Sequence, residues 1–90
     1  MLKTLEDLIN IIRDRKNSSP DKSYTKKLLA DKSLSTKKVK EEIAELIEAV
    51  ENNSNTVHEA ADVLYHLLVY LEGNGVRIED IMLELDKRRK

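Results

Sequence analysis

Apolar residues recur along this chain at intervals of three and four positions, which is the spacing of one face of an α-helix. Four such residues predict a first helix: Leu5, Leu8, Ile9 and Ile12. This helix is expected to end near the polar run 17–21, which contains Pro20 and is the clearest loop in the chain. A short helix over 24–30 follows, and residues 31–34 are expected to form a connector.

A longer helix is expected to begin after Ser35 or Thr36, because either side chain can cap a helix. Its apolar residues form a single stripe: Val39, Ile43, Leu46, Ile47 and Val50. A further helix is predicted over 57–72, between an Asn-rich turn and a Gly-Asn-Gly stop. The last helix is predicted over 78–87, with three residues directed inward: Ile81, Met82 and Leu85. The fold class is therefore all-α, a bundle of about four to five helices.

Composition agrees with this pattern and narrows it. The 90 residues suit a single domain, 1–90, with 40% hydrophobic residues and only 3% aromatic residues. A chain this short buries a limited core, so completion of the bundle by homodimerisation is expected. The net charge of -1 argues against a nucleic-acid partner. No apolar run approaches the roughly 20 residues of a membrane span, so a cytoplasmic location is expected. Cysteine is absent, which excludes disulfides, thiolate zinc sites and cysteine nucleophiles.

The predicted helix 57–72 is apolar on nearly every side, which is typical of a central, buried helix. Its polar residues Glu59, Asp62 and His66 fall in one narrow arc at about 100° per residue. A polar arc on a buried helix needs partners, because an ionised carboxylate away from water is costly unless it is paired or binds a cation.

The preceding helix carries a matching pair of carboxylates. Glu42 and Glu45 are three positions apart and are therefore neighbours on the flank of the apolar stripe, whereas Glu41 and Glu48 point further toward solvent. Antiparallel packing across the short connection would bring this pair toward Glu59 and Asp62. The pattern thus predicts four clustered carboxylates, E-x-x-E facing E-x-x-D.

Four carboxylates in one place repel one another, and a hard divalent cation is the simplest relief. Oxygen ligands suit Mg²⁺, or Mn²⁺, better than zinc. Magnesium held by few protein ligands commonly partners substrate phosphates, so the pattern indicates a site for a polyphosphate. A water activated by the metal or by a spare carboxylate would attack phosphorus.

Structural alternatives exist for each of these residues. An E-x-x-E pair arises by chance in Lys/Glu-rich helices, usually on a solvated face. Glu59 also fits a capping box with Thr56. Lys38 can pair with Glu42 on the surface, and His66 is more readily a hydrogen-bonded core group than a metal ligand. His58 is expected at the surface. The joint pattern, and no single residue, favours a functional site.

The runs 38–45 and 59–69 closely resemble phosphoribosyl-ATP pyrophosphohydrolase of histidine biosynthesis. Ser23-Tyr24-Thr25 and the upstream Arg15 resemble the same family, and the similarity covers about residues 5–88. The pairing of E-x-x-E with E-x-x-D is shared with the wider MazG-like, all-α nucleoside triphosphate pyrophosphohydrolases. The resemblance implies a helical homodimer that hydrolyses phosphoribosyl-ATP to phosphoribosyl-AMP and pyrophosphate with Mg²⁺.

The resemblance also implies roles for individual residues. The metal ligands and catalytic residues would be the four carboxylates: Glu42, Glu45, Glu59 and Asp62. Lys38, Arg15 and Tyr24 would contact phosphate or the nucleotide. Two alternatives remain, a housecleaning pyrophosphohydrolase acting on free (d)NTPs and a non-catalytic helical dimer or adaptor. A di-iron carboxylate bundle is weaker, because the sequence has no Glu-x-x-His pair.

Overall fold

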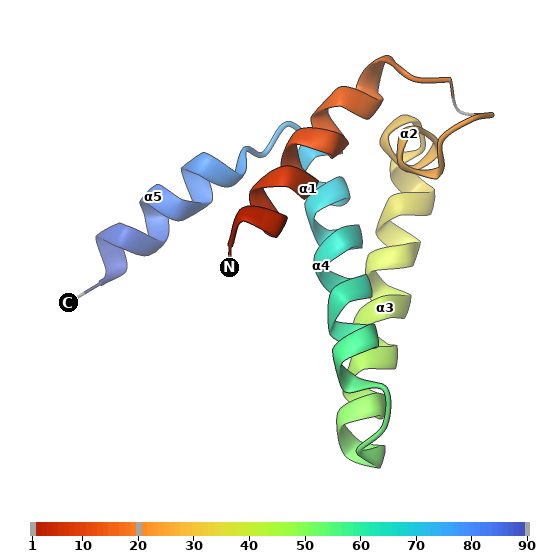
Figure 1. Ribbon diagram of the computed structural model, residues 1–90, viewed down its shortest axis with the longest axis vertical. Coiled ribbons are helices and arrows are strands. Elements are labelled where there is room, and N and C mark those ends of the chain that lie inside the picture. The colour runs from red at the N-terminus through yellow and green to blue at the C-terminus, as the bar shows by residue number, and fades with distance from the viewer. Residues whose placement is uncertain (1, 20, 90) are drawn as a thin grey trace.

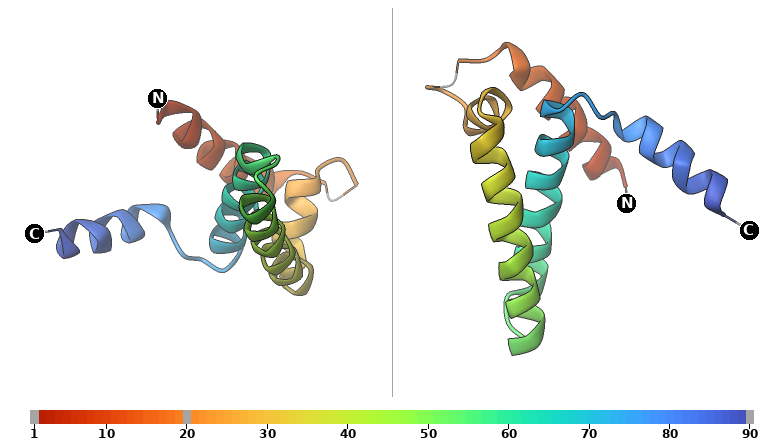
Figure 2. Two further views of the ribbon diagram at one scale, coloured as in Figure 1. Left: turned by 90° about the horizontal axis from the view of Figure 1, so that it is seen from below. Right: turned by 180° about the vertical axis from the view of Figure 1, so that it is seen from behind.

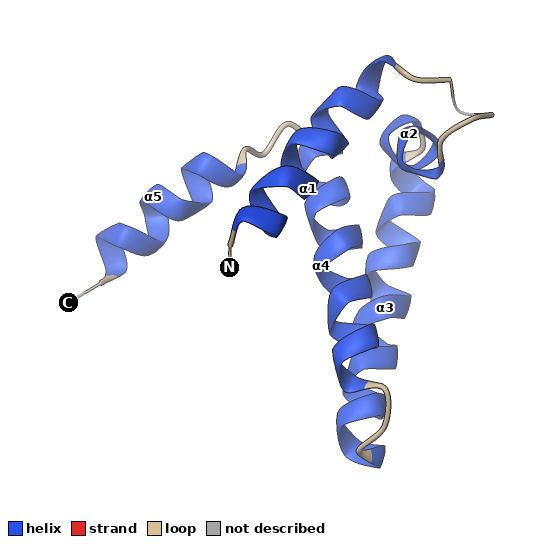
Figure 3. Ribbon diagram, in the orientation of Figure 1, coloured by secondary structure: helices blue, strands red, loops and turns tan. Residues whose placement is uncertain are grey.

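The computed structural model describes residues 2–19 and 21–89, and within these ranges every regular element is a helix (Figures 1 and 3). The elements are α1 (Lys3–Asp14), the 3₁₀ helix η1 (Arg15–Asn17), α2 (Tyr24–Ala30), α3 (Lys32–Asn52), α4 (Thr56–Gly73) and α5 (Ile78–Arg88). The all-α prediction is confirmed, and α2 has the predicted bounds. Pro20, in the predicted loop, lies outside the described residues.

Helix α4 is the centre of the molecule and packs against α1, α2, α3 and α5, as its apolar sequence predicts. It runs antiparallel to α3, and the two form a long hairpin (Figures 1 and 2). Asn53 and Asn55 in the connecting turn have φ values of 51° and 54°. Asparagine tolerates this left-handed conformation better than most residues, which explains the Asn-rich turn.

The hydrophobic core lies at one end of this hairpin, where α1 and α2 cover α4. It consists of five buried residues: Ile9, Ile12, Leu28, Leu68 and Val69. Ile12, Leu28 and Val69 are almost completely enclosed. The rest of the hairpin extends beyond this core, so the predicted carboxylate positions lie on a part of α3 and α4 that α1 does not cover (Figure 1).

Two helix starts differ from the predictions. Helix α3 begins at Lys32, because Oδ1 of Asp31 accepts the backbone N–H of Leu34 at 3.0 Å and caps the helix. The predicted caps Ser35 and Thr36 are therefore wrong, and Ser35 is buried within the helix. The capping box of Thr56 is also wrong. Its hydroxyl donates to the backbone oxygen of Ala49, so Glu59 is not held by a cap.

The apolar stripe of α3 does not lie against α4 as a whole. The buried residues of α3 are Ser35 and Ala49, whereas Ile43, Ile47 and Val50 are exposed. The physical reason is a rotation: these three residues lie roughly 80–140° around the helix from the face that meets α4. Part of the predicted core stripe thus forms an apolar surface on the outside of the hairpin.

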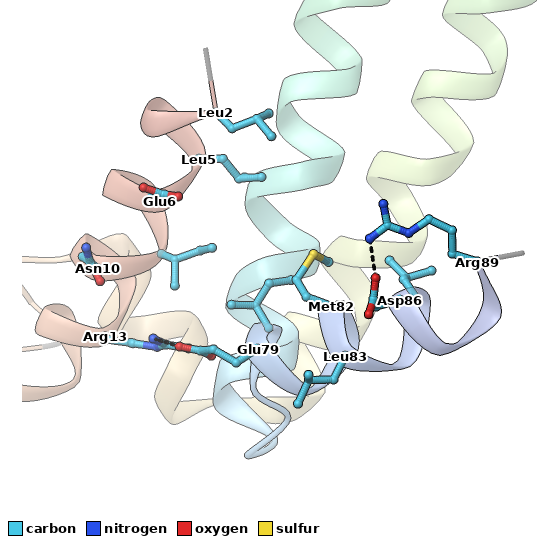
Figure 4. Close-up of a pocket in the computed structure, with 13 residues that line it drawn as sticks. Leu2, Leu5, Glu6, Asn10, Arg13, Glu79, Met82, Leu83, Asp86 and Arg89 are labelled. Atoms are coloured by element: carbon cyan, nitrogen blue, oxygen red, sulfur yellow. Dashed lines mark hydrogen bonds and ion pairs between the residues drawn. The ribbon is translucent and has the colours of Figure 1, made fainter.

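Helix α5 projects away from the other helices (Figures 1 and 2). None of its residues 78–88, all of which are described, is buried. Met82 and Leu85, predicted to point inward, are about half exposed because α5 meets the body only near its first turn. Their apolar side chains line an open groove between α1 and α5 (Figure 4).

An ion network fixes the start of α5 to α1 and α4. Arg13 donates to Glu72 at 2.7 Å and, through both terminal nitrogens, to Glu79 at 2.9 and 2.6 Å (Figure 4 shows the second pair). Lys16 also reaches Glu72, at 3.2 Å. Glu72 is buried, so these cations offset the cost of placing its charge away from water. Among the described residues, no helix is long and apolar enough to cross a membrane.

Candidate functional site

The structure brings carboxylates from α3 and α4 together. Oxygens of Glu42, Glu45 and Glu59 lie within 4.8 Å of one another. Oxygens of Glu59 and Asp62 and a ring nitrogen of His58 form a second such group. Glu59 belongs to both groups and links them. The four carboxylates that the sequence singled out therefore occupy one continuous cluster between two antiparallel helices.

Within the described part of the chain, two buried oxygens in this cluster lack the hydrogen-bond partner that a buried oxygen normally has. Oε2 of Glu42 and Oε2 of Glu59 are inaccessible to solvent, and no described residue donates a hydrogen bond to either. Burial raises the pKa of Glu42, and the negative charge of Glu45 raises it further. The pKa of Glu59 is raised by the same two causes in the same order. These two oxygens thus need a partner that the described residues do not supply.

The donor set fits a hard cation. Carboxylate oxygens are the ligands that Mg²⁺ and Mn²⁺ prefer, and Glu42, Glu45, Glu59 and Asp62 could supply them. A bound cation would satisfy the two orphaned oxygens and cancel the repulsion among the carboxylates. Glu45 is exposed, so the cluster is open to solvent on that side.

His58 has a neighbour that the sequence reasoning overlooked. It lies at the surface as predicted, but its Nε2 is 3.4 Å from Oδ2 of Asp62. In the sequence, the spacing of four residues between His58 and Asp62 on one helix could have indicated this contact. In the structure this contact gives Asp62 a partner at the outer edge of the cluster.

A hydrogen-bonded aromatic group borders the cluster on the side of α2. His66 is buried, as predicted for a core histidine, and contacts the hydroxyl of Tyr24 at 3.2 Å. The ring of Tyr65 stacks on that of Tyr24, with centroids 6.4 Å apart, and its hydroxyl contacts that of Thr25. Ser23 caps α2 by accepting the backbone N–H of Lys26. These contacts hold the start of α2 against the middle of α4.

The two predicted cations differ in position. Lys38 pairs with Glu41 at 3.4 Å and not with Glu42, so the expected surface pair was assigned to the wrong carboxylate. Glu41 is itself half-buried and not fully solvent-facing. Hydrogen bonding to Glu41 raises the pKa of Lys38. Arg15 lies on η1, 3.9 Å from Asp14, and the contacts of the described residues do not bring it to the carboxylates.

Fold and site together define an all-α protein with a carboxylate cluster, suited to a divalent cation, between two antiparallel helices. A family model described as phosphoribosyl-ATP pyrophosphohydrolase matches residues 5–89. A phosphoribosyl-ATP pyrophosphatase of Methylobacterium nodulans is 49% identical over 88 residues, covering 94% of this chain and 82% of the relative. The chain belongs to the phosphoribosyl-ATP pyrophosphohydrolase family.

Two further relatives show how the family domain is used. A phosphoribosyl-ATP pyrophosphatase of Halobacterium salinarum is 40% identical over 91 residues, which cover 94% of this chain and 96% of the relative. The histidine biosynthesis bifunctional protein HisIE of Thermotoga maritima is 42% identical over 87 residues, covering 93% of this chain but 44% of the relative. The same domain thus occurs at nearly its own length and as part of a longer protein.

Proposed function

We propose that this chain hydrolyses phosphoribosyl-ATP to phosphoribosyl-AMP and pyrophosphate, the second step of histidine biosynthesis, and does so in the cytoplasm. The observation that carries the proposal is the cluster of four carboxylates with two buried, unsatisfied oxygens in a member of this family. Such a cluster is unfavourable by itself and becomes favourable when it binds a cation.

Glu42, Glu45, Glu59 and Asp62 would hold Mg²⁺, with Mn²⁺ as a substitute. When bound, the ion supplies positive charge that lets an acidic pocket accept a polyphosphate and stabilises the negative charge of the leaving pyrophosphate. Water attacks phosphorus, the anhydride linkage between the α- and β-phosphates breaks, and the water proton passes to a carboxylate. A carboxylate oxygen of the cluster that the ion does not occupy would accept this proton.

The substrate contacts come from elements beside the cluster. Lys38 lies one turn before Glu42 on α3, where its ammonium group can meet a phosphate after leaving Glu41. Tyr24 lies at the start of α2, half exposed beside the cluster. Arg15 on η1 is the most distant of the three assignments. It faces solvent at the end of the molecule that η1 and α2 share, and would contact an outlying phosphate.

We also propose that two copies of the chain form a homodimer. Large apolar side chains are exposed on both helices of the hairpin, including Ile47 at 54% and Leu64 at 52%, and along α5. A chain of this size gains little from its own core, and exposed apolar surface of this extent is typical of an interface. A second copy is the partner that places apolar surface against apolar surface without requiring another gene product.

The test is release of pyrophosphate by the purified protein from phosphoribosyl-ATP with Mg²⁺, compared with release from dNTPs. We expect turnover of phosphoribosyl-ATP, loss of turnover in Glu45→Gln and retention in Glu51→Gln, which removes an exposed charge nearly two turns away. Faster turnover of dNTPs would indicate a housecleaning enzyme instead. If neither substrate is hydrolysed and Mg²⁺ with nucleotide leaves the melting temperature unchanged, a non-catalytic role is correct.

A further inference from the structure

A buried histidine connects the carboxylate cluster to α2. His66 lies one helical turn after Asp62 on α4, and 8% of it is exposed. Its Nδ1 is 2.9 Å from the backbone oxygen of Asp62, and its Nε2 is 3.2 Å from the hydroxyl of Tyr24. Both ring nitrogens therefore have a partner. The ring is fixed between the turn that carries a carboxylate of the cluster and the first residue of α2.

These two contacts determine where the hydrogens lie. The backbone oxygen of Asp62 can only accept, so Nδ1 of His66 carries a hydrogen and donates it. In a neutral imidazole the other nitrogen is then an acceptor. In this neutral tautomer the hydroxyl of Tyr24 donates to Nε2. Its only hydrogen is used in this bond, and toward any other group the oxygen of Tyr24 is an acceptor.

The hydroxyl of Tyr24 is linked through His66 to the backbone of Asp62, which carries a carboxylate of the cluster. Burial raises the pKa of Tyr24, the charge of Lys38 lowers it, and the charge of Glu42 raises it, so the hydroxyl lies within electrostatic reach of both. Stacking on Tyr65 and an edge contact with His66 hold the ring. Nevertheless 48% of Tyr24 is exposed, so part of this fixed residue is open to solvent and to a ligand.

We propose that His66 is a positioning residue that acts through Tyr24: it fixes the phenol as a hydrogen-bond acceptor, so that Tyr24 recognises a hydroxyl or amino group of the nucleoside part of the substrate and not a phosphate. Phosphate oxygens are acceptors, and an acceptor facing them gains no hydrogen bond. This inference rests on the proposed function, because it assigns a contact with that nucleotide. It also separates the role of Tyr24 from that of the cations, which meet phosphate.

Two substitutions of His66 separate its two contacts. In His66→Asn the amide can still donate to the backbone oxygen of Asp62 but cannot reach Tyr24. In His66→Gln the amide oxygen can reach the position of Nε2 and accept from Tyr24. We expect His66→Asn and Tyr24→Phe each to raise KM for phosphoribosyl-ATP about three- to tenfold with little change in kcat. His66→Gln should restore most of the wild-type KM.

A double-mutant cycle tests whether His66 acts through Tyr24. His66→Asn in the Tyr24→Phe background should raise KM less than about twofold further, because the hydroxyl that it positions is already gone. The inhibition constant of tripolyphosphate, which has no nucleoside, should not change in either variant. Multiplicative effects on KM, or no effect of His66→Asn, would overturn the positioning role. An equal change for tripolyphosphate would assign Tyr24 to phosphate and overturn the acceptor assignment.

The same cycle on the dissociation constant of phosphoribosyl-AMP, measured by calorimetry, requires no turnover. A wild-type protein that binds this nucleotide but does not hydrolyse phosphoribosyl-ATP would overturn the proposed function alone. Absence of coupling between His66 and Tyr24 in this binding, or absence of binding, would overturn the positioning role. If His66→Asn does not fold, His66→Gln with and without Tyr24→Phe gives the comparison. If His66→Gln binds phosphoribosyl-AMP and the addition of Tyr24→Phe does not weaken this binding, the proposal is wrong.

Discussion

Removing the charge of Glu45 should make the protein more stable and less able to bind magnesium. Oxygens of Glu42 and Glu45 lie within 4.8 Å of each other. Two unit charges at this separation repel by about 1 kcal/mol in a water-like dielectric and by about 3.5 kcal/mol at an effective dielectric of about 20. Because Glu45 is exposed, the lower value applies. A change of about 1 kcal/mol in the free energy of unfolding shifts the melting temperature of a domain of roughly 60–100 residues by about 4–8 °C.

The assay is thermal unfolding of wild type and Glu45→Gln, each with and without Mg²⁺. Without the ion, we expect the variant to melt about 4–8 °C above wild type. Addition of Mg²⁺ should raise the melting temperature of wild type and close most of this gap, since binding to the folded state stabilises it. Glu51→Gln, an exposed substitution on the same helix, should behave as wild type in both conditions.

Melting of Glu45→Gln at or below the wild-type temperature in the absence of the ion would refute the expected repulsion. In that case the carboxylates do not repel one another in solution as their distances require. An equal shift of both proteins by Mg²⁺ would show that Glu45 contributes nothing to the cation site. Either result would remove the main support for the proposed hydrolysis.

Three further outcomes follow from other parts of the molecule. Ile47→Glu should convert the homodimer to a monomer, as measured by light scattering after gel filtration. Asn52→Glu adds the same charge at an exposed polar position of α3 and should leave the dimer intact, so equal masses for the two variants would argue against this interface. Hydrogen bonding to Arg13 lowers the pKa of Glu79 to about 2, so the stability from this pair is complete above about pH 4.5 and is lost as the pH falls toward 2. The melting temperature of Glu79→Gln should therefore approach that of wild type as the pH falls through this window. A difference that stays constant with pH would refute the assignment. Ile12→Ala should lower the free energy of unfolding by about 2–5 kcal/mol in urea titrations, and a loss below about 1 kcal/mol would show that its site collapses.

The elements and the carboxylate cluster could be predicted because both depend on local geometry. Spacing of three residues on a helix puts Glu42 beside Glu45 and Glu59 beside Asp62, whatever the rest of the chain does. The short turn between α3 and α4 then requires antiparallel packing. Whether the two pairs of carboxylates face each other depends on tertiary structure. The polar arc on the otherwise apolar helix α4 was enough to indicate that they do.

What could not be predicted depends on contacts between distant parts of the sequence. The stripe containing Ile43 and Ile47 satisfies the rule for a core face, but apolar residues directed to a second surface follow the same rule. Periodicity cannot distinguish them. Similarly, the link between Arg13 and Glu72 joins positions 59 residues apart, and no local pattern indicates it. The cap of α3 was missed because Asp31, Ser35 and Thr36 are all good capping residues.

The position of Glu42 on α3 is the strongest argument that the cluster has a function. Ser35, Glu42 and Ala49 are spaced by seven residues, which puts them in one row along the face that packs against α4. The first and last of these are small and buried, and they let the two helices approach. A leucine at the middle position would fill the interface without any electrostatic cost. Instead this position holds a carboxylate with one buried, unsatisfied oxygen. A buried carboxylate oxygen without a partner opposes stability at the centre of a helix interface, and a second such carboxylate lies opposite on α4. This arrangement is expected only where a ligand supplies the missing interaction.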